Sequence, residues 1–312
     1  MTHQSDAPFD PVRPLPQYNY YIYLLFFLMN TLSLIGQFFT VVTYRSIRNK
    51  NNKFYGYIAW HSLIGLPWVF SNYLTIALVN QNDAGCKMAA IVHSTSYLAY
   101  MIWSTVIALV ILSSLRKQTK IPGLKTWYIV ATYTLSFLLM YYPIVSDSFG
   151  PYKARGMRIC SFKDSGSTGF IIGYYAPLRV TTIINLICYG WSLFLVRANA
   201  SQESNQAFKS FLYFPLLSMV CNSQFFLRRA ELMIAGRASI FYFELLHILL
   251  ARGQGFFEAL IYWFKVKIEI KRSWVRANRR TQRRIHVPLV FDESSIENEI
   301  NERSRKMLAT TL

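Results

Sequence analysis

Residues 251–272 read ARGQGFFEALIYWFKVKIEIKR, and the interpretation of the whole chain depends on this stretch. Its first half is aromatic and apolar enough to lie in a bilayer, yet it contains Arg252, Gln254 and Glu258. Its second half is strongly basic. Ionisable side chains inside a membrane are rare and costly, and they generally mark functional positions. The stretch is therefore predicted to be a functional membrane helix that ends at a basic boundary.

The composition also indicates a membrane protein. Of the 312 residues, 53% are hydrophobic and only 15% are charged, whereas soluble domains are about one-quarter charged. The net charge of +18 can indicate nucleic-acid binding. The basic residues lie between apolar runs, however, so no nucleic-acid partner is expected. Four cysteines are too few for a disulfide scaffold and lack zinc-site spacing, so no metal or other cofactor is predicted.

Apolar runs predict the fold class. A transmembrane helix needs about 20 mostly apolar residues. Segments of at least this length lie at 18–44, 54–79, 87–115, 126–146, 169–196, 210–234 and 239–264. The runs could be buried helices of a soluble protein, but so many in succession argue against it. The prediction is an all-α membrane protein with a seven-transmembrane helix bundle over residues 18–264.

The distribution of Lys and Arg predicts the orientation, because cytoplasmic loops are enriched in both. With the N-terminus outside, basic residues crowd the three inner loops and the segment 265–284. Residues 1–17 are then an extracellular segment of a multi-pass protein of the cell membrane. Residues 265–284 are predicted to form a short amphipathic cytoplasmic helix that contacts anionic membrane lipid. Residues 285–312 are predicted to be a disordered cytoplasmic tail.

Several of these segments together resemble one family, the cyclic-AMP-receptor-like G-protein-coupled receptors, which are related to the secretin and adhesion receptors. The likeness covers about residues 18–265. It is carried by LSLIGQFFTVVTY at 32–44, Gly85-Cys86 with YMIWSTVIALVI at 100–111, YYAPLRVTTIINLICYGWSLFLVR at 174–197, FLYFPLLSMVCNSQFFLRRAEL at 211–232 and RGQGFFEALIYWF at 252–264. The chain departs from the family at Glu258, where relatives usually have Asn, and after Cys160, where relatives often have Trp.

The resemblance implies a receptor that binds a small extracellular ligand and activates a heterotrimeric G protein. It implies a disulfide between Cys86 and Cys160, both on the oxidising side, where such a bond is stable. It also implies roles in activation or helix packing for Trp103, Pro177, Asn185, Tyr189, Pro215, Gln254, Gly255, Glu258 and Tyr262. Independently of the resemblance, Gly255 suits close helix approach and Gln254 suits a hydrogen bond across the bundle.

Arg252 and Glu258 raise a separate question of pairing. They lie six residues apart, which is about 240° around a helix, so they do not face each other. Each therefore needs a partner on another element. For Arg252 two alternatives stay open: structural pairing across helices, or a position facing a wet cavity where it contacts a ligand.

Basic residues on the outer side indicate the chemistry of the ligand. Arginine side chains suit phosphate or carboxylate groups. An anionic ligand is therefore expected, although solvated surface charge is an open alternative, and the family resemblance implies that the ligand is cyclic-nucleotide-like. The candidate ligand-binding residues are Lys153, Arg155 and Arg158 in the long outer loop, with Arg179, Arg228, Arg229 and Arg252 in the bundle.

Other functions fit the sequence less well. In the predicted spans His61 and His93 lie at different depths, so they cannot share a zinc ion in an intramembrane hydrolase. Residues 239–264 contain no lysine for a retinal pump. The protein is therefore not expected to be an enzyme. A seven-helix transporter or channel is the remaining alternative, although the related halves of a repeat-type transporter are not evident.

Overall fold

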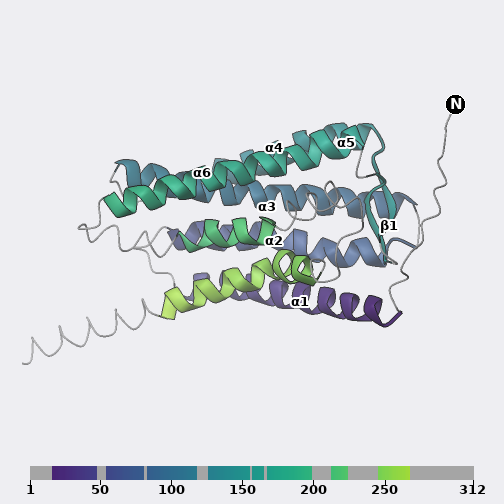
Figure 1. Ribbon diagram of the computed structural model, residues 1–312, viewed down its shortest axis with the longest axis horizontal. Coiled ribbons are helices and arrows are strands. Elements are labelled where there is room, and N and C mark those ends of the chain that lie inside the picture. The colour runs from purple at the N-terminus through teal and green to yellow at the C-terminus, as the bar shows by residue number, and fades with distance from the viewer. Residues whose placement is uncertain are drawn as a thin grey trace, which may run out of the picture. The chain divides into compact units, whose positions relative to one another are not determined.

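The computed structural model describes residues 16–47, 54–80, 83–117, 126–154, 157–164, 167–198, 212–223 and 245–267. In the compact unit that ends at Trp263, long helices lie side by side and a β-hairpin caps one end of the bundle (Figure 1). Four helices in the described ranges are long and apolar enough to cross a membrane, namely Tyr20–Arg45, Asp83–Arg116, Thr126–Val145 and Thr168–Ala198.

The described residues in each of the seven predicted segments are largely helical. The labelled elements are α1 (Pro16–Ile47), α2 (Phe54–Ala77), α3 (Asp83–Lys117), α4 (Thr126–Val145), α5 (Thr168–Phe170), η1 (Ile171–Tyr175), α6 (Ala176–Ala198) and η2 (Ile248–Arg252). The sixth segment is described as a helix at 213–223, and the seventh at 245–267 with η2 inside it. Helices α1 and α3 begin a few residues before the predicted spans at 18 and 87, because apolarity does not define where a helix begins.

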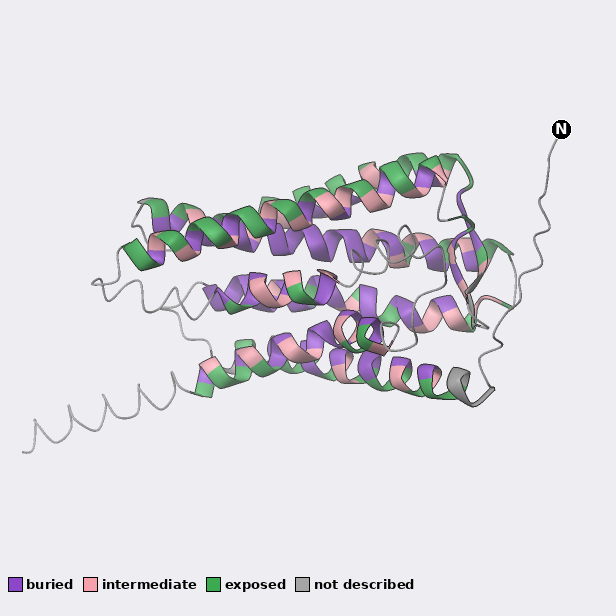
Figure 2. Ribbon diagram, viewed as in Figure 1, coloured by how far each residue is buried: buried purple, intermediate pink, exposed green. Residues whose placement is uncertain are grey.

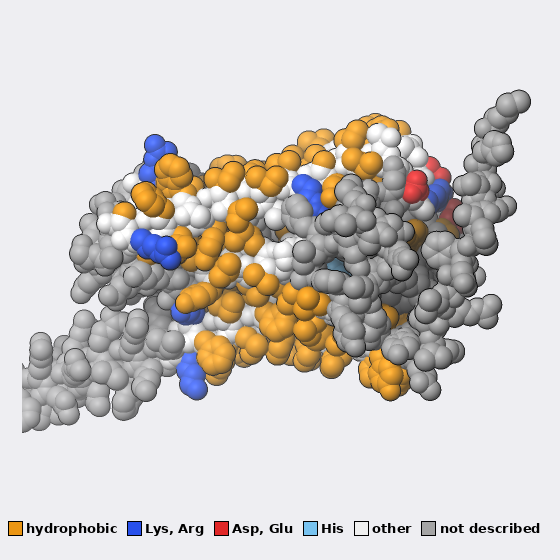
Figure 3. All heavy atoms as spheres, viewed as in Figure 1, with side chains coloured by type: hydrophobic (Ala, Val, Ile, Leu, Met, Phe, Trp, Pro, Cys, Tyr) orange, Lys and Arg blue, Asp and Glu red, His pale blue; other side chains and the backbone are white. Residues whose placement is uncertain are grey.

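Helix α3 is the centre of the bundle. It packs against α2, α4, α6 and the hairpin. In the most apolar 18-residue window of each helix, 72% of α3 is buried, against 22% of α4 and 28% of the continuous helix Thr168–Ala198 that contains α6 (Figure 2). Helices α4 and α6 expose large apolar side chains such as Phe137, Leu138 and Trp191. The exposed apolar side chains form a broad belt between charged groups at the two ends (Figure 3). This distribution suits a bundle surrounded by lipid.

The long loop between α4 and α5 adds β-structure that the all-α expectation did not include. Its residues form two antiparallel strands, β1 (Phe149–Ala154) and β2 (Met157–Phe162). The rings of Phe149 and Phe162 pack 4.5 Å apart at the base of the hairpin, where both are buried. The expected disulfide between Cys86 and Cys160 is present, and its Cα atoms are 5.1 Å apart. The loop is therefore an ordered cover attached to α3 rather than a plain connection.

Ion pairs hold the same hairpin to the bundle. The Asp147 carboxylate lies 2.5 Å from Nζ of Lys163 and 2.9 Å from Nζ of Lys87. These two ammonium groups, Lys163 first, hold the pKa of the Asp147 carboxyl below its usual value. Lys87 also pairs with Asp83 at 3.0 Å. Lys163, although basic and exposed, is therefore committed to a structural contact.

Some predicted regions lie outside the described residues. These are most of the extracellular segment 1–17, nearly all of the amphipathic helix 265–284 and the whole tail 285–312.

Gly173 supplies a sharp test of packing in the fifth segment. A Cβ atom at this position would lie 2.6 Å from Cδ of Pro143 and 2.9 Å from the carbonyl oxygen of Leu139. Both neighbours are stiff, so a methyl group forces η1 away from α4.

We predict that Gly173→Ala lowers the free energy of unfolding in detergent by about 1–3 kcal/mol, the usual cost of overpacking. Gly190→Ala in the same continuous helix, Thr168–Ala198, is the matched control, because nothing lies within 4 Å of a Cβ atom there. The control should be neutral, or stabilising by up to about 1 kcal/mol through helix propensity. Equal stability of the two variants would contradict the described packing of η1.

Candidate functional site

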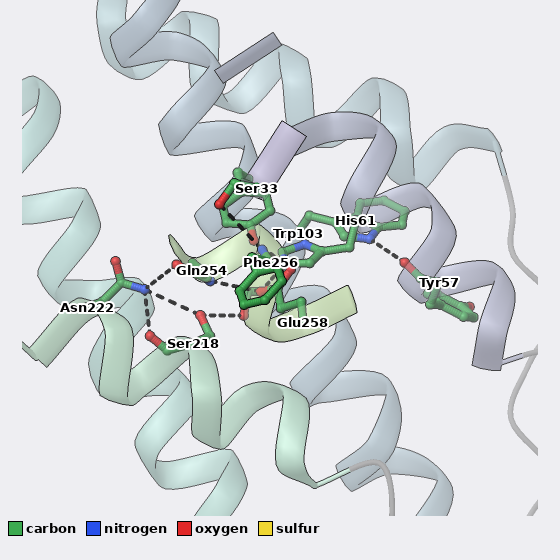
Figure 4. A network of polar contacts seen from close by, with 11 residues as sticks. Ser33, Tyr57, His61, Trp103, Ser218, Asn222, Gln254, Phe256 and Glu258 are labelled. Atoms are coloured by element: carbon green, nitrogen blue, oxygen red, sulfur yellow. Dashed lines mark hydrogen bonds and ion pairs between the residues drawn. The ribbon is translucent and has the colours of Figure 1, made fainter. Parts of the chain in front are cut away.

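The carboxylate of Glu258 is the centre of a buried polar network (Figure 4). The hydroxyl of Tyr100 donates to Oε2 at 2.6 Å, and Nε2 of Gln254 donates to Oε1 at 2.9 Å. Nε2 of His61 lies 3.1 Å from the same Oε1. All four side chains are buried. The carboxylate is thus held by groups from α2, α3 and its own helix.

The network extends to the sixth segment. Nδ2 of Asn222 lies 3.5 Å from Oε1 of Gln254 and donates to it, and Tyr97 of α3 donates to Oδ1 of Asn222. One turn away, Oγ of Ser104 donates to Oγ of Ser218 at 3.1 Å. The second, third, sixth and seventh segments therefore each contribute polar side chains to one connected set.

Aromatic rings enclose this set. The ring of Tyr100 stacks on His61 with centroids 4.0 Å apart, and it also stacks on Trp68 with centroids 5.1 Å apart. These contacts hold the imidazole and the phenol in position. A buried polar network in which most members are satisfied is rigid and specifies one arrangement of its helices.

Arg252 has different partners, in agreement with its predicted separation from Glu258. Its Nη1 donates to Oδ1 of Asn72 on α2, and its guanidinium lies 5.0 Å from the centre of the Phe26 ring. Asn72 in turn donates to Oδ1 of Asn30 at 2.8 Å. Arg252 therefore pairs with a residue of another helix, but this partner is a neutral amide rather than a carboxylate. No carboxylate pairs with Arg252 in the described part of the chain.

Two π-helical turns carry residues that interact electrostatically at this guanidinium. η2 carries Arg252 itself, and η1 carries Tyr174, which lies close enough to interact electrostatically with it, as does Tyr97. Arg179, one turn beyond η1, lies over the Tyr175 ring at 4.4 Å and is also within electrostatic range of Tyr97. Single π-helical turns frequently occur at functional sites. The set of Asn72, Tyr97, Tyr174, Arg179 and Arg252 is called the Arg252 cluster below.

The structure does not describe the side chains of the other predicted ligand-binding residues. Lys153 and Arg158 face each other in the register of β1 and β2, and their side chains are not described. Arg155, Arg228 and Arg229 lie outside the described residues.

The remaining predicted packing residues take several positions. Nε1 of Trp103 donates to the Tyr57 carbonyl oxygen at 3.0 Å, and Tyr262 packs edge-on against Tyr55 at 5.6 Å. Asn185 and Pro215 are buried, whereas Pro177 and Tyr189 are partly buried. The carbonyl oxygen of Gly255 would lie 3.0 Å from a Cβ atom at Gly36 of α1, which fits the close helix approach expected there.

Sequence reasoning missed the partners that complete both clusters. Asn30, Asn72, Tyr97 and Tyr100 were not selected, and His61 was considered only as a zinc ligand. The available signal was weak but real, because Asn30, Asn72 and His61 are polar residues inside apolar runs, where such groups hydrogen-bond across helices. No set of three His, Cys, Asp or Glu side chains in the described ranges could hold a metal ion.

Comparison with known proteins adds no assignment. No model of a known protein family matches the chain, and none of the curated proteins is significantly similar to it.

The Glu258 network predicts a strong energetic coupling between Tyr100 and Glu258. Tyr100→Phe should lower the free energy of unfolding by about 1.5–3 kcal/mol, because it removes a hydrogen bond to a charged acceptor. In a Glu258→Gln background the same change should cost clearly less, since the charged acceptor is already lost. The measurement is a double-mutant cycle followed by denaturant unfolding in detergent.

Tyr142→Phe provides the control for this cycle, because Tyr142 is exposed on α4. Its effect should add to that of Glu258→Gln within about 0.5 kcal/mol. Additive behaviour of Tyr100→Phe as well would show that the carboxylate does not hold the α3 phenol.

Proposed function

We propose that the protein is a seven-helix receptor of the cell membrane that binds a small extracellular ligand and activates a heterotrimeric G protein. The N-terminus lies outside and the basic loops at 45–53, 116–125 and 197–209 lie inside. The proposal rests mainly on one observation. Two sets of polar residues, one around Arg252 and one around Glu258, follow each other along the same helix. Arg252 belongs to the cluster defined above, which is the proposed outer pocket, and Glu258 belongs to the buried network, only six residues further along.

The outer pocket supports an anionic ligand. The guanidinium of Arg252 is partly buried among aromatic rings, and its described partners are a neutral amide and a phenyl ring. A charge in such surroundings is costly unless a counter-charge reaches it. In the proposed site a carboxylate or phosphate on a ligand supplies this counter-charge, and Arg179 provides a second contact. A cyclic-nucleotide-like compound has the required chemistry.

Ser33 of α1 links the outer pocket to the network below. Its Oγ donates to the backbone carbonyl of Arg252 and accepts from the backbone N–H of Phe256 at 3.4 Å. Because η2 is a π-helical turn, this carbonyl lies where the regular helical ladder is interrupted. A ligand that draws Arg252 toward it changes the geometry of this turn, and Gln254 and Glu258 follow directly after it.

Signalling then follows from a shift between two arrangements of the bundle. A ligand shifts the balance only by its difference in affinity for the two states. In the state with the Glu258 network intact, the second, third, sixth and seventh segments are held together. Loosening this network allows the inner ends of the fifth, sixth and seventh segments to separate. The basic inner loops then accept the G protein.

The experiment is a screen of small anionic and neutral metabolites on the protein reconstituted with heterotrimeric G proteins, with nucleotide exchange as the readout. A receptor gives exchange with at least one compound, and anionic compounds should predominate among the hits. Flux of a compound or ion across protein-containing liposomes, without nucleotide exchange, would favour the transporter or channel instead.

With an active compound in hand, Arg179→Gln should weaken its binding by about 10- to 150-fold, the loss expected for one charge-assisted hydrogen bond. The loss should shrink for a neutral analogue. Lys163→Gln is the control, because it removes the same charge from the outer side at a residue already paired with Asp147. Binding that is unchanged in Arg179→Gln, at normal surface expression, would exclude the anion contact.

A further inference from the structure

Gln37 of α1 is the one polar side chain beside the Glu258 network whose amide nitrogen and oxygen both lack a hydrogen-bond partner among the described residues. It is fully buried. Its amide lies against two glycines of neighbouring helices. A Cβ atom at Gly255 would be 2.8 Å from Nε2 of Gln37, and one at Gly65 of α2 would overlap the same nitrogen. The two glycines therefore leave space that the amide enters.

A second buried polar atom, on a neighbouring helix, also lacks a hydrogen-bond partner among the described residues. Nδ1 of His61 is buried and has no partner in the described part of the chain. His61 lies one turn before Gly65, so the two positions share a face of α2. The ring of Tyr100 borders both, since it stacks on His61 at 4.0 Å and its Cε2 is 2.9 Å from the Cβ position of Gly65. The amide of Gln37 and the ring of His61 thus both lie near Gly65 and Tyr100, and the space between them is the candidate site.

The chemistry of these atoms selects the occupant. Buried polar atoms are almost always paired, and internal water pairs those that protein groups leave over. A cation is disfavoured, because the oxygens of Glu258 already contact Tyr100, Gln254 and His61. An anion would meet the acceptor atoms of Gln37 and His61. Water donates and accepts, so it fits every group present.

We propose that ordered water is bound in this space and joins α1 to the Glu258 network through Gln37 and His61. When Nε2–H of His61 donates to Glu258, Nδ1 is an acceptor. One water then donates to Nδ1 and accepts from Nε2 of Gln37, and a second donates to Oε1 of Gln37. Bound in this way, water fixes the tautomer of His61 and connects the first, second and seventh segments.

Hydroxyl-radical labelling by X-ray radiolysis tests the proposal, because bound water generates radicals next to the side chains it contacts. The full chain in lipid nanodiscs is irradiated and analysed by mass spectrometry. Tyr100 should be labelled several times faster than Tyr262, although both are fully buried. In Gln37→Leu this excess should disappear. Equal labelling of the two tyrosines, or an excess that survives the substitution, overturns the proposal.

Thermal unfolding provides a second, independent test of the proposal. If the space is hydrated, Gln37→Leu breaks the water bridge and lowers the unfolding midpoint. If it is dry, the same change removes two unsatisfied polar atoms and raises the midpoint, which would overturn the proposal. Gln37→Met has the same length without branching, and it replaces Gln37→Leu in both measurements if that variant does not fold.

Discussion

The carboxylate of Glu258 lies in a hydrophobic bundle where solvent cannot satisfy it, so the surrounding helices must. A bilayer core offers no hydrogen-bond partners, and an unpaired polar group there costs several kcal/mol. Tyr100, Gln254 and His61 supply the contacts, and each can do so only if its helix has the correct rotation and depth. The central position of α3 and the close approach at Gly255 follow from this single requirement.

The same constraint explains why one helix combines two polar layers. Arg252 and Glu258 point to different neighbours, so each fixes the seventh segment to a different part of the bundle. The π-helical turn that ends at Arg252 separates the two layers and leaves backbone groups for Ser33 to bind. In the proposed receptor this turn is where ligand binding outside becomes a change in the network below. A rigid network with one adjustable turn is suited to two discrete states rather than to continuous deformation.

The helices could be predicted from the sequence because long apolar runs need no knowledge of what packs against them. The disulfide between Cys86 and Cys160 could be predicted because the resemblance paired these positions. The hairpin over Phe149–Phe162 could not, since its short strands carry no strong alternating pattern. The partners of Arg252 and Glu258 could not be named either. Helical spacing excluded a direct pair, but the choice of Asn72 and His61 depends on the rotation and depth of α2, which local sequence does not encode.

The central claim is that the chain crosses the membrane an odd number of times with its N-terminus outside. Epitope tags at residue 1 and residue 312, read by antibody on intact and permeabilised cells, test it most directly. We expect the first tag to be stained on intact cells and the second only after permeabilisation. Staining of both tags on intact cells, or of the second alone, would contradict the seven-helix receptor.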